Sequence, residues 1–201
     1  MTTAIKKFSL AAAILAGLGT SSLAPAARAA ETYAVDPVHS SISFGISHAG
    51  ISDIHGRFND FSGTFVIDKD DPSKSSFALD IKVASVDTNN AKRDEHLRAP
   101  DYFNAKQFPS LSFKSTKVKA TDAGYEVTGD LTLHGVTKPV TLTLKGGHKV
   151  VEFPKGTPRI GVTSSVTIKR SEFDMKTELG ALGDDVHIIV GLEAAKEKAK
   201  P

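Results

Sequence analysis

The sequence predicts an all-β domain, and two observations point to this fold class. Turn-forming residues recur along the chain, as at residues 70–73 (DDPS), 122–124 (DAG) and 146–147 (GG). Between such turns, apolar residues alternate with polar ones, which is the period of a strand that is buried on one face. The alternation occurs in eight segments, at residues 42–46, 61–67, 77–83, 111–113, 127–133, 140–144, 160–168 and 186–192.

Two architectures fit eight such strands. Open sheet edges invite aggregation, so the strands are expected to form a closed or a doubled sheet. An eight-stranded antiparallel barrel can hold one small ligand inside it, whereas a sandwich of two sheets is filled by its own side chains. The alternation alone leaves both open.

One stretch, residues 89–108, breaks the alternation. Its first part, residues 90–98, is compatible with a short helix, and Thr88 or Asn89 can cap the first turn. The proline at position 100 is expected to stop this helix. We therefore predict a short helical insertion around residues 89–108 in an otherwise all-β domain.

The first 29 residues have the three-part pattern of a cleaved signal peptide. Lys6 and Lys7 precede an apolar run at residues 8–18, and small residues follow up to Ala27-Arg28-Ala29. The apolar run is shorter than the roughly 20 residues that a membrane-spanning helix needs. We expect cleavage after Ala29 and export to the periplasm; the alternative is an uncleaved N-terminal anchor.

Charge and cysteine content exclude several classes of protein. The chain has 25 Lys+Arg and 23 Asp+Glu, but residues 1–29 hold three of the basic residues and no acidic one, so the remainder carries about −1. A nucleic-acid-binding domain would show a basic patch or stripe, so no nucleic acid is expected as a partner. The chain contains no cysteine, which excludes disulfides, thiolate metal sites and a lipid anchor on cysteine.

One domain is expected from residue 30 to residue 193. The rest of the chain, residues 194–201, is rich in Ala, Lys and Glu and is expected to form a flexible tail. A domain of this length can bury a sizeable core without disulfides.

Eight strings of residues, in their order and spacing, closely resemble one known family, the YceI-like family of polyisoprenoid-binding periplasmic proteins. The resemblance covers roughly residues 32–192. In place of a glycine soon after the last string, this chain has Asp174 and Met175, which affects only the local turn. The strings are residues 44–48 (FGISH), 56–63 (GRFNDFSG), 85–88 (SVDT), 94–97 (DEHL), 101–104 (DYFN), 108–115 (FPSLSFKS), 129–140 (GDLTLHGVTKPV) and 169–173 (KRSEF).

The resemblance implies a lipocalin-like antiparallel barrel with an elongated internal cavity. It also implies an isoprenoid-type or other long-chain amphipathic ligand, with neither catalysis nor a cofactor. Side chains alternate between the two faces of a strand, so the inward rows should form the ligand surface. The predicted inward residues are Phe44, Ile46, Phe65, Ile81, Phe113, Leu131, Leu142, Val166 and Ile188.

Two cations end these inward rows and complete the predicted ligand site. His48 continues the row of Ile46, and Arg170 continues the row of Val166. A cation in this position suits the mouth of a barrel, where the polar head of a lipid would lie. The alternative is a structural role, for Arg170 in an ion pair with Asp94 or Asp87, because a charged side chain is rarely buried without a partner.

A histidine-dependent metal-binding protein or acid–base enzyme is the alternative function. Seven histidines occur, and Asp94 and His96 share the helix-like segment. However, the sequence contains neither an HExxH string nor a GxSxG elbow, and it indicates no substrate geometry. A plain structural or adhesion domain is a third reading.

The favoured reading is a periplasmic protein that carries, stores or senses a long-chain lipid and is not an enzyme. Its expected partner is the lipid, of polyisoprenoid or isoprenoid quinone type. We expect no metal site, no cofactor and no stable membrane anchor, and the sequence leaves a homodimer open.

Overall fold

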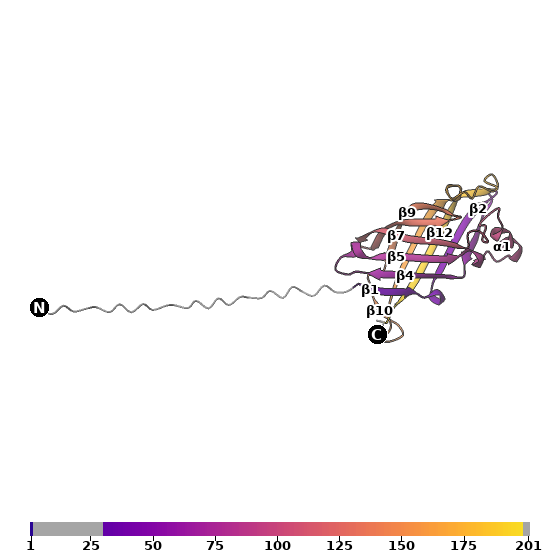
Figure 1. The fold of residues 1–201 in the computed structure, drawn as a ribbon. Coiled ribbons are helices and arrows are strands. Elements are labelled where there is room, and N and C mark those ends of the chain that lie inside the picture. Colours follow the sequence, from indigo (N-terminus) through magenta and orange to yellow (C-terminus); the bar gives the residue numbers. More distant parts are fainter. Residues whose placement is uncertain (2–29, 199–201) are drawn as a thin grey trace.

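The computed structural model describes Met1 and residues 30–198 of the chain. Residues 30–198 form an elongated barrel of β-strands with a short helix at one end (Figure 1). The predicted signal peptide, apart from Met1, and residues 199–201 lie outside the described residues.

Most of the described chain is strand. The strands are β1 (Glu31–Val35), β2 (Ser41–His48), β3 (Ser52–Phe58), β4 (Phe61–Ile67), β5 (Ser76–Lys82), β6 (Val86–Asp87), β7 (Ser110–Thr121), β8 (Gly124–Leu133), β9 (Val136–Gly146), β10 (Val151–Glu152), β11 (Pro158–Lys169) and β12 (Leu182–Lys196). The helix is α1 (Ala91–Arg98), and short 3-10 helices lie at Pro37–His39, Pro72–Lys74, Val83–Ser85 and Arg170–Phe173.

Eight of the described strands close the barrel, and every neighbouring pair is antiparallel. Around the ring they follow the order β1, β4, β5, β7, β8, β9, β11 and β12, and β12 pairs with β1 again. β2, β3 and β6 extend the sheet beyond β12, and β10 adds to β11. The predicted eight-stranded antiparallel barrel with a short helix is thus confirmed, and the sandwich is excluded.

Each predicted segment falls on a strand, but β1 and β3 were not predicted. The first predicted strand, β2, lies outside the ring, and β1 takes its place in the ring. β1 has only five residues, too few for a clear alternation. In β3 the row of Ile54 and Phe58 is interrupted by Gly56. A Cβ atom on Gly56 would collide with the ring of Phe44 on β2, so glycine makes room for that ring.

The C-terminal strand is longer than predicted. β12 continues to Lys196, so the prediction of a flexible tail from residue 194 is wrong for residues 194–196. Ala194 is fully buried and lies opposite Val35 of β1 and Ile160 of β11. The small side chain of Ala194 allows three strands to pack closely here. The Ala-, Lys- and Glu-rich composition of residues 194–201 gave no sign that Ala194 would be buried.

The helix α1 lies within the segment where a helix was predicted. It is found at one end of the barrel (Figure 1). Its N-cap is Asn90, whose side chain accepts a hydrogen bond from the backbone N–H of Arg93, so the predicted caps Thr88 and Asn89 were wrong. The helix ends before Ala99, which is extended because the following proline disfavours helical backbone there.

The ring is not hydrogen-bonded along its whole length. β9 and β11 pair only at Val162–Gly146 and Thr163–Lys145. Nearer α1 the two strands separate, and apolar side chains fill the gap between them, among them Val140 of β9 and Ile168 of β11. On this side the two strands are joined by side-chain packing rather than by backbone hydrogen bonds.

Candidate functional site

A largely apolar cavity of about 380 Å³ occupies the inside of the barrel. This volume lies in the range of roughly 300–1,000 Å³ that is typical of ligand pockets. The structure brings all eleven predicted site residues to its wall, namely Phe44, Ile46, His48, Phe65, Ile81, Phe113, Leu131, Leu142, Val166, Arg170 and Ile188.

The cavity is closed at the end away from α1. The rings of Phe65 and Phe77 pack there with centroids 5.2 Å apart, and Tyr125 packs 5.4 Å from Phe77. Val162 and Leu192 complete this floor and are almost fully buried. Tyr125 has the one polar group among these five side chains, and burial raises the pKa of its hydroxyl, which therefore stays uncharged. The floor is thus suited to the end of a hydrocarbon tail.

The middle of the cavity has an accessible wall. Phe113, Leu142, Val166 and Ile188 line the cavity, and each is only half-buried. Their exposed surface faces the cavity, because these side chains point to the inside of the barrel. A guest in this space would remove apolar surface from water, which is favourable.

The other end of the cavity is polar. The side chains that line it there come from β2, from α1 and the segments on either side of α1, and from the segment between β11 and β12. They are His48, Thr88, Arg93, His96, Tyr102, Arg170 and Glu178. We call this polar end the mouth.

Arg170 is buried and bonded to backbone carbonyls. Only 4% of it is exposed. Its Nε donates to Gly183 at 2.8 Å, one terminal nitrogen donates to Met175 and Thr177 at 2.9 and 2.8 Å, and the other donates to Leu182 at 3.2 Å. The guanidinium thus ties the 3-10 helix at Arg170–Phe173 to the loop that precedes β12 and to the first two residues of β12.

The predicted partners of Arg170 are occupied elsewhere. Asp94 accepts hydrogen bonds from the backbone N–H and the hydroxyl of Thr88, at 2.8 and 2.6 Å. Asp87 accepts hydrogen bonds from Asn59 and Arg57. The suggested ion pair of Arg170 with either carboxylate is therefore wrong, because the loop carbonyls satisfy the guanidinium instead.

Arg93 is a mouth residue that the sequence reasoning missed. Its Nε donates to the hydroxyl of Thr88 and one terminal nitrogen, Nη2, donates to the carbonyl of Thr88, both at 2.7 Å. Within the described chain its other terminal nitrogen, Nη1, has no hydrogen-bond partner. The string DEHL directly follows Arg93 in the sequence and was the available signal.

Tyr102 and Glu178 form a second pair at the mouth, also missed from the sequence. The Tyr102 hydroxyl donates to a carboxylate oxygen of Glu178 at 2.8 Å. Burial, and then this bond, raise the pKa of Tyr102 to about 12, so the hydroxyl stays protonated. The His96 ring packs edge-on against Tyr102, 4.9 Å between centroids. His48 lies exposed at the end of β2.

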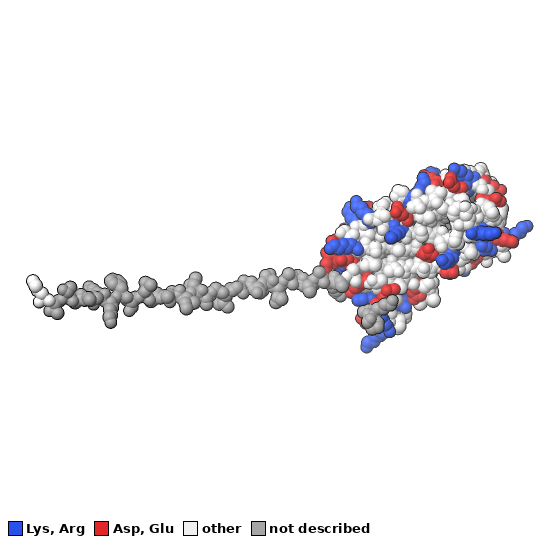
Figure 2. Space-filling view, in the orientation of Figure 1, with Lys and Arg blue, Asp and Glu red and all other residues white. Residues whose placement is uncertain are grey.

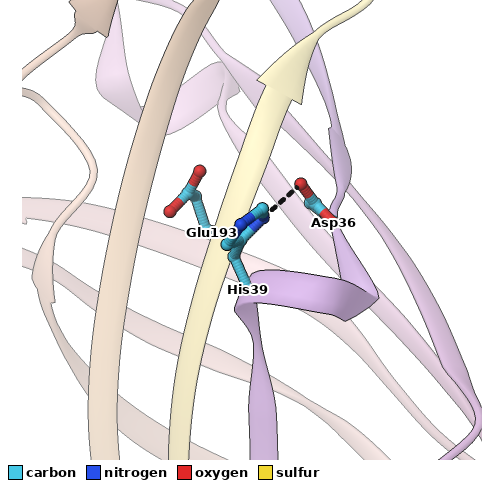
Figure 3. A group of neighbouring side chains, drawn as sticks. All are labelled: Asp36, His39 and Glu193. Atoms are coloured by element: carbon cyan, nitrogen blue, oxygen red, sulfur yellow. Dashed lines mark hydrogen bonds and ion pairs between the residues drawn. The ribbon is translucent and has the colours of Figure 1, made fainter. Parts of the chain in front are cut away.

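One group of described residues has the composition of a metal site, but it lies outside the cavity. Possible ligand atoms of Asp36, His39 and Glu193 all lie within 4.8 Å of one another. Figure 3 shows the three side chains grouped together. Arg159 donates to Asp36 at 2.7 Å and to Glu193 at 2.6 Å, and His39 lies 2.9 Å from Asp36. The bond from Arg159 is the main cause of the low pKa of Asp36.

This group is therefore satisfied as an ion-pair network. The Arg159 guanidinium bridges the two carboxylates that a metal ion would need. It links β11 to β12 and to the residue that follows β1. The cluster gives no support to the metal-dependent alternative.

The outer surface carries mixed charge. On the face drawn in Figure 2, basic and acidic side chains are interspersed and leave uncharged areas between them. Among the described residues, no helix is long and apolar enough to cross a bilayer.

Comparison with known proteins agrees with the fold. The family model of the YceI-like domain matches residues 33–194. A UPF0312 protein of Photorhabdus laumondii is 43% identical over 162 residues, which is 80% of this chain and 83% of the relative.

Two solved structures show the same fold. A Campylobacter jejuni YceI protein is 33% identical with a TM-score of 0.67, over 76% of this chain and 90% of the other. A polyisoprenoid binding domain from Saccharophagus degradans is 19% identical with a TM-score of 0.65, over 82% and 98%. The protein described here is a member of the YceI-like family.

Proposed function

We propose that this protein binds a long-chain amphipathic lipid of isoprenoid type, with the tail inside the barrel and the polar head at the mouth. The observation that carries the proposal is the apolar cavity inside the barrel, with its closed floor and its polar mouth. The name of the Saccharophagus degradans neighbour, a polyisoprenoid binding domain of the same fold, supports this ligand class.

The tail would supply most of the affinity. Burying a methylene group contributes about 0.8 kcal/mol, so about ten methylenes offer on the order of 8 kcal/mol before the cost of ordering the chain. One charge-assisted hydrogen bond at the mouth adds about 1.5–3 kcal/mol. The tail therefore decides whether a lipid binds, and the mouth decides which head group is accepted.

A binding role fits the mouth better than catalysis. Tyr102 is bonded to Glu178, and Asp94 and Arg93 are both bonded to Thr88. These groups hold one another in place, which suits recognition of a head group. The same site would serve a protein that carries, stores or senses the lipid.

The site of action proposed is the periplasm. The three-part pattern of residues 1–29 supports export and cleavage after Ala29. N-terminal sequencing of exported protein should begin at Ala30; a mature protein that still began at Met1 would argue against this location.

Native mass spectrometry of freshly purified protein tests the proposed function. We expect a mass increment of one lipid per chain, and the same lipid in an organic extract of the sample. Protein stripped of lipid should rebind an added polyprenol at a ratio of one to one. A protein that carries no lipid and binds none of the long-chain lipids added to it would refute the proposal.

A further inference from the structure

The deep half of the cavity contains one polar side chain in an otherwise apolar row. The inward residues of β11 are Ile160, Val162, Ser164, Val166 and Ile168, which alternate with exposed residues. Ser164 is only 8% exposed and lines the cavity. Its hydroxyl oxygen is buried and has no hydrogen-bond partner among the described residues.

The position of Ser164 is defined by its neighbours. It lies opposite Val190 of β12, one inward position above the floor residue Val162. It directly follows Thr163, the last residue of β11 that pairs with β9. Ile168, four residues further along the strand, lies beside Arg170 at the mouth, which places the hydroxyl about 13 Å below the mouth at about 3.3 Å per residue.

The described residues provide no hydrogen-bond partner for the buried hydroxyl of Ser164. A serine hydroxyl can donate one hydrogen bond and accept two. Buried polar groups in proteins nearly always have a partner. A trapped water would itself need two to four polar partners, yet the neighbours of Ser164 along and across the strands are Val162, Val166 and Val190.

We propose that Ser164 is a subsite for an uncharged hydrogen-bonding group, such as a hydroxyl or carbonyl oxygen, carried by the buried part of the ligand about 13 Å from its polar head. The inference rests on the proposed lipid-binding function and narrows the ligand class. A plain hydrocarbon tail leaves the hydroxyl unpaired, whereas a tail with a polar group at this depth satisfies both partners. A charged group is excluded, because the surroundings are apolar.

A series of octadecanoic acids with one hydroxyl at successive carbons tests this inference. Affinities are measured for the wild type, for Ser164→Ala and for Ser165→Ala, a matched control because Ser165 is exposed on the outer face of the same strand. In the wild type and in the control, one position of the hydroxyl near the predicted depth should bind about fivefold or more tightly than its neighbours. Ser164→Ala should lose this maximum and keep its affinity for unsubstituted octadecanoic acid.

A second measurement separates ligand recognition from a structural role. Ligand-free Ser164→Ala should have an unfolding temperature equal to or higher than that of the wild type, because it removes an unpaired buried hydroxyl. A lower unfolding temperature would show that the hydroxyl has a structural partner and would overturn the inference.

The outcomes of the binding series are distinct. A flat positional profile in the wild type, or a maximum that persists in Ser164→Ala, would overturn the subsite and leave lipid binding intact. Failure of both the whole series, including the unsubstituted acid, and a polyprenol to bind would contradict the proposed function itself.

Discussion

Two arginines line the mouth and differ in how many of their N–H groups are already bonded. Arg170 donates four of its five N–H groups to backbone carbonyls. Arg93 donates two, both to Thr88. The geometry therefore favours a structural role for Arg170, the alternative that the sequence left open, and makes Arg93 the better candidate for contact with a head group.

Arg170→Ala should strongly destabilise the fold. The substitution leaves four carbonyls, one buried and three partly buried, without this donor. An unpaired buried group costs about 1–3 kcal/mol, and such costs are not fully additive. We expect the free energy of unfolding to fall by about 3 kcal/mol or more. Lys169→Ala is the control, since its ion pair with Asp185 is exposed and should contribute about 1 kcal/mol or less. Denaturant unfolding of both variants checks this, and equal losses would contradict the structural role.

Arg93→Ala should change which head groups are accepted. We expect an anionic long-chain lipid to bind about tenfold more weakly, since one charge-assisted hydrogen bond is lost. A neutral lipid with the same tail should bind nearly as before. Titration calorimetry measures both, with Lys92→Ala, an exposed cation on the same helix, as the control. Equal weakening of the two lipids would assign Arg93 to the framework of the mouth.

At the scale of elements, the short strand β1 is fastened at both ends by ion pairs. At its start, Glu31 bonds to Lys196 of β12 at 3.0 Å and to Lys69 at 2.9 Å. Just after its end, Asp36 bonds to Arg159 of β11 at 2.7 Å. β1 has only five residues and completes the ring, so these contacts help to close the barrel.

The Glu31 contact makes stability depend on pH. Hydrogen bonds from Tyr33, Lys69 and Lys196 lower the pKa of Glu31 from 4.5 to about 2. The unfolded chain therefore binds a proton first as pH falls, so the stabilisation is present above pH 4.5 and is lost between pH 4.5 and about 2.

Glu31→Gln should remove this part of the pH dependence. We expect the variant to be less stable than the wild type at neutral pH and to approach it as the pH falls toward about 2. Urea unfolding at a series of pH values measures both curves. Parallel curves over this range would show that Glu31 does not fasten β1.

At the scale of the whole molecule, the fold prediction rested on the regular alternation of apolar and polar residues along the chain. Inward and outward positions follow from the period of two along a strand, so all eleven predicted residues reach the cavity wall. The same rule places Ser164 in the inward row between Val162 and Val166.

The mouth could not be predicted in the same way. It is assembled from α1 and from irregular segments that lie far apart in the sequence, such as Tyr102 and Glu178. Their hydrogen bonds depend on tertiary packing, which leaves no periodic signal. For this reason the sequence indicated a cation at position 170 but gave neither its carbonyl partners nor the position of Arg93.

The central claim is that the lipid occupies the inside of the barrel, and two neighbouring isoleucines on β12 test it most directly. Ile188 lines the cavity, whereas Ile189 is 60% exposed on the outer face. The cavity of about 380 Å³ can accept a larger side chain, so Ile188→Trp should fold and fill the space that the tail needs. Ile189→Trp leaves the cavity unchanged and is the matched control.

The measurement is the affinity of both folded variants for a polyprenol, with folding checked by circular dichroism. The account predicts that Ile188→Trp weakens binding at least tenfold, while Ile189→Trp binds like the wild type. Wild-type affinity in a folded Ile188→Trp variant, or loss of binding only in Ile189→Trp, would contradict a ligand site inside the barrel.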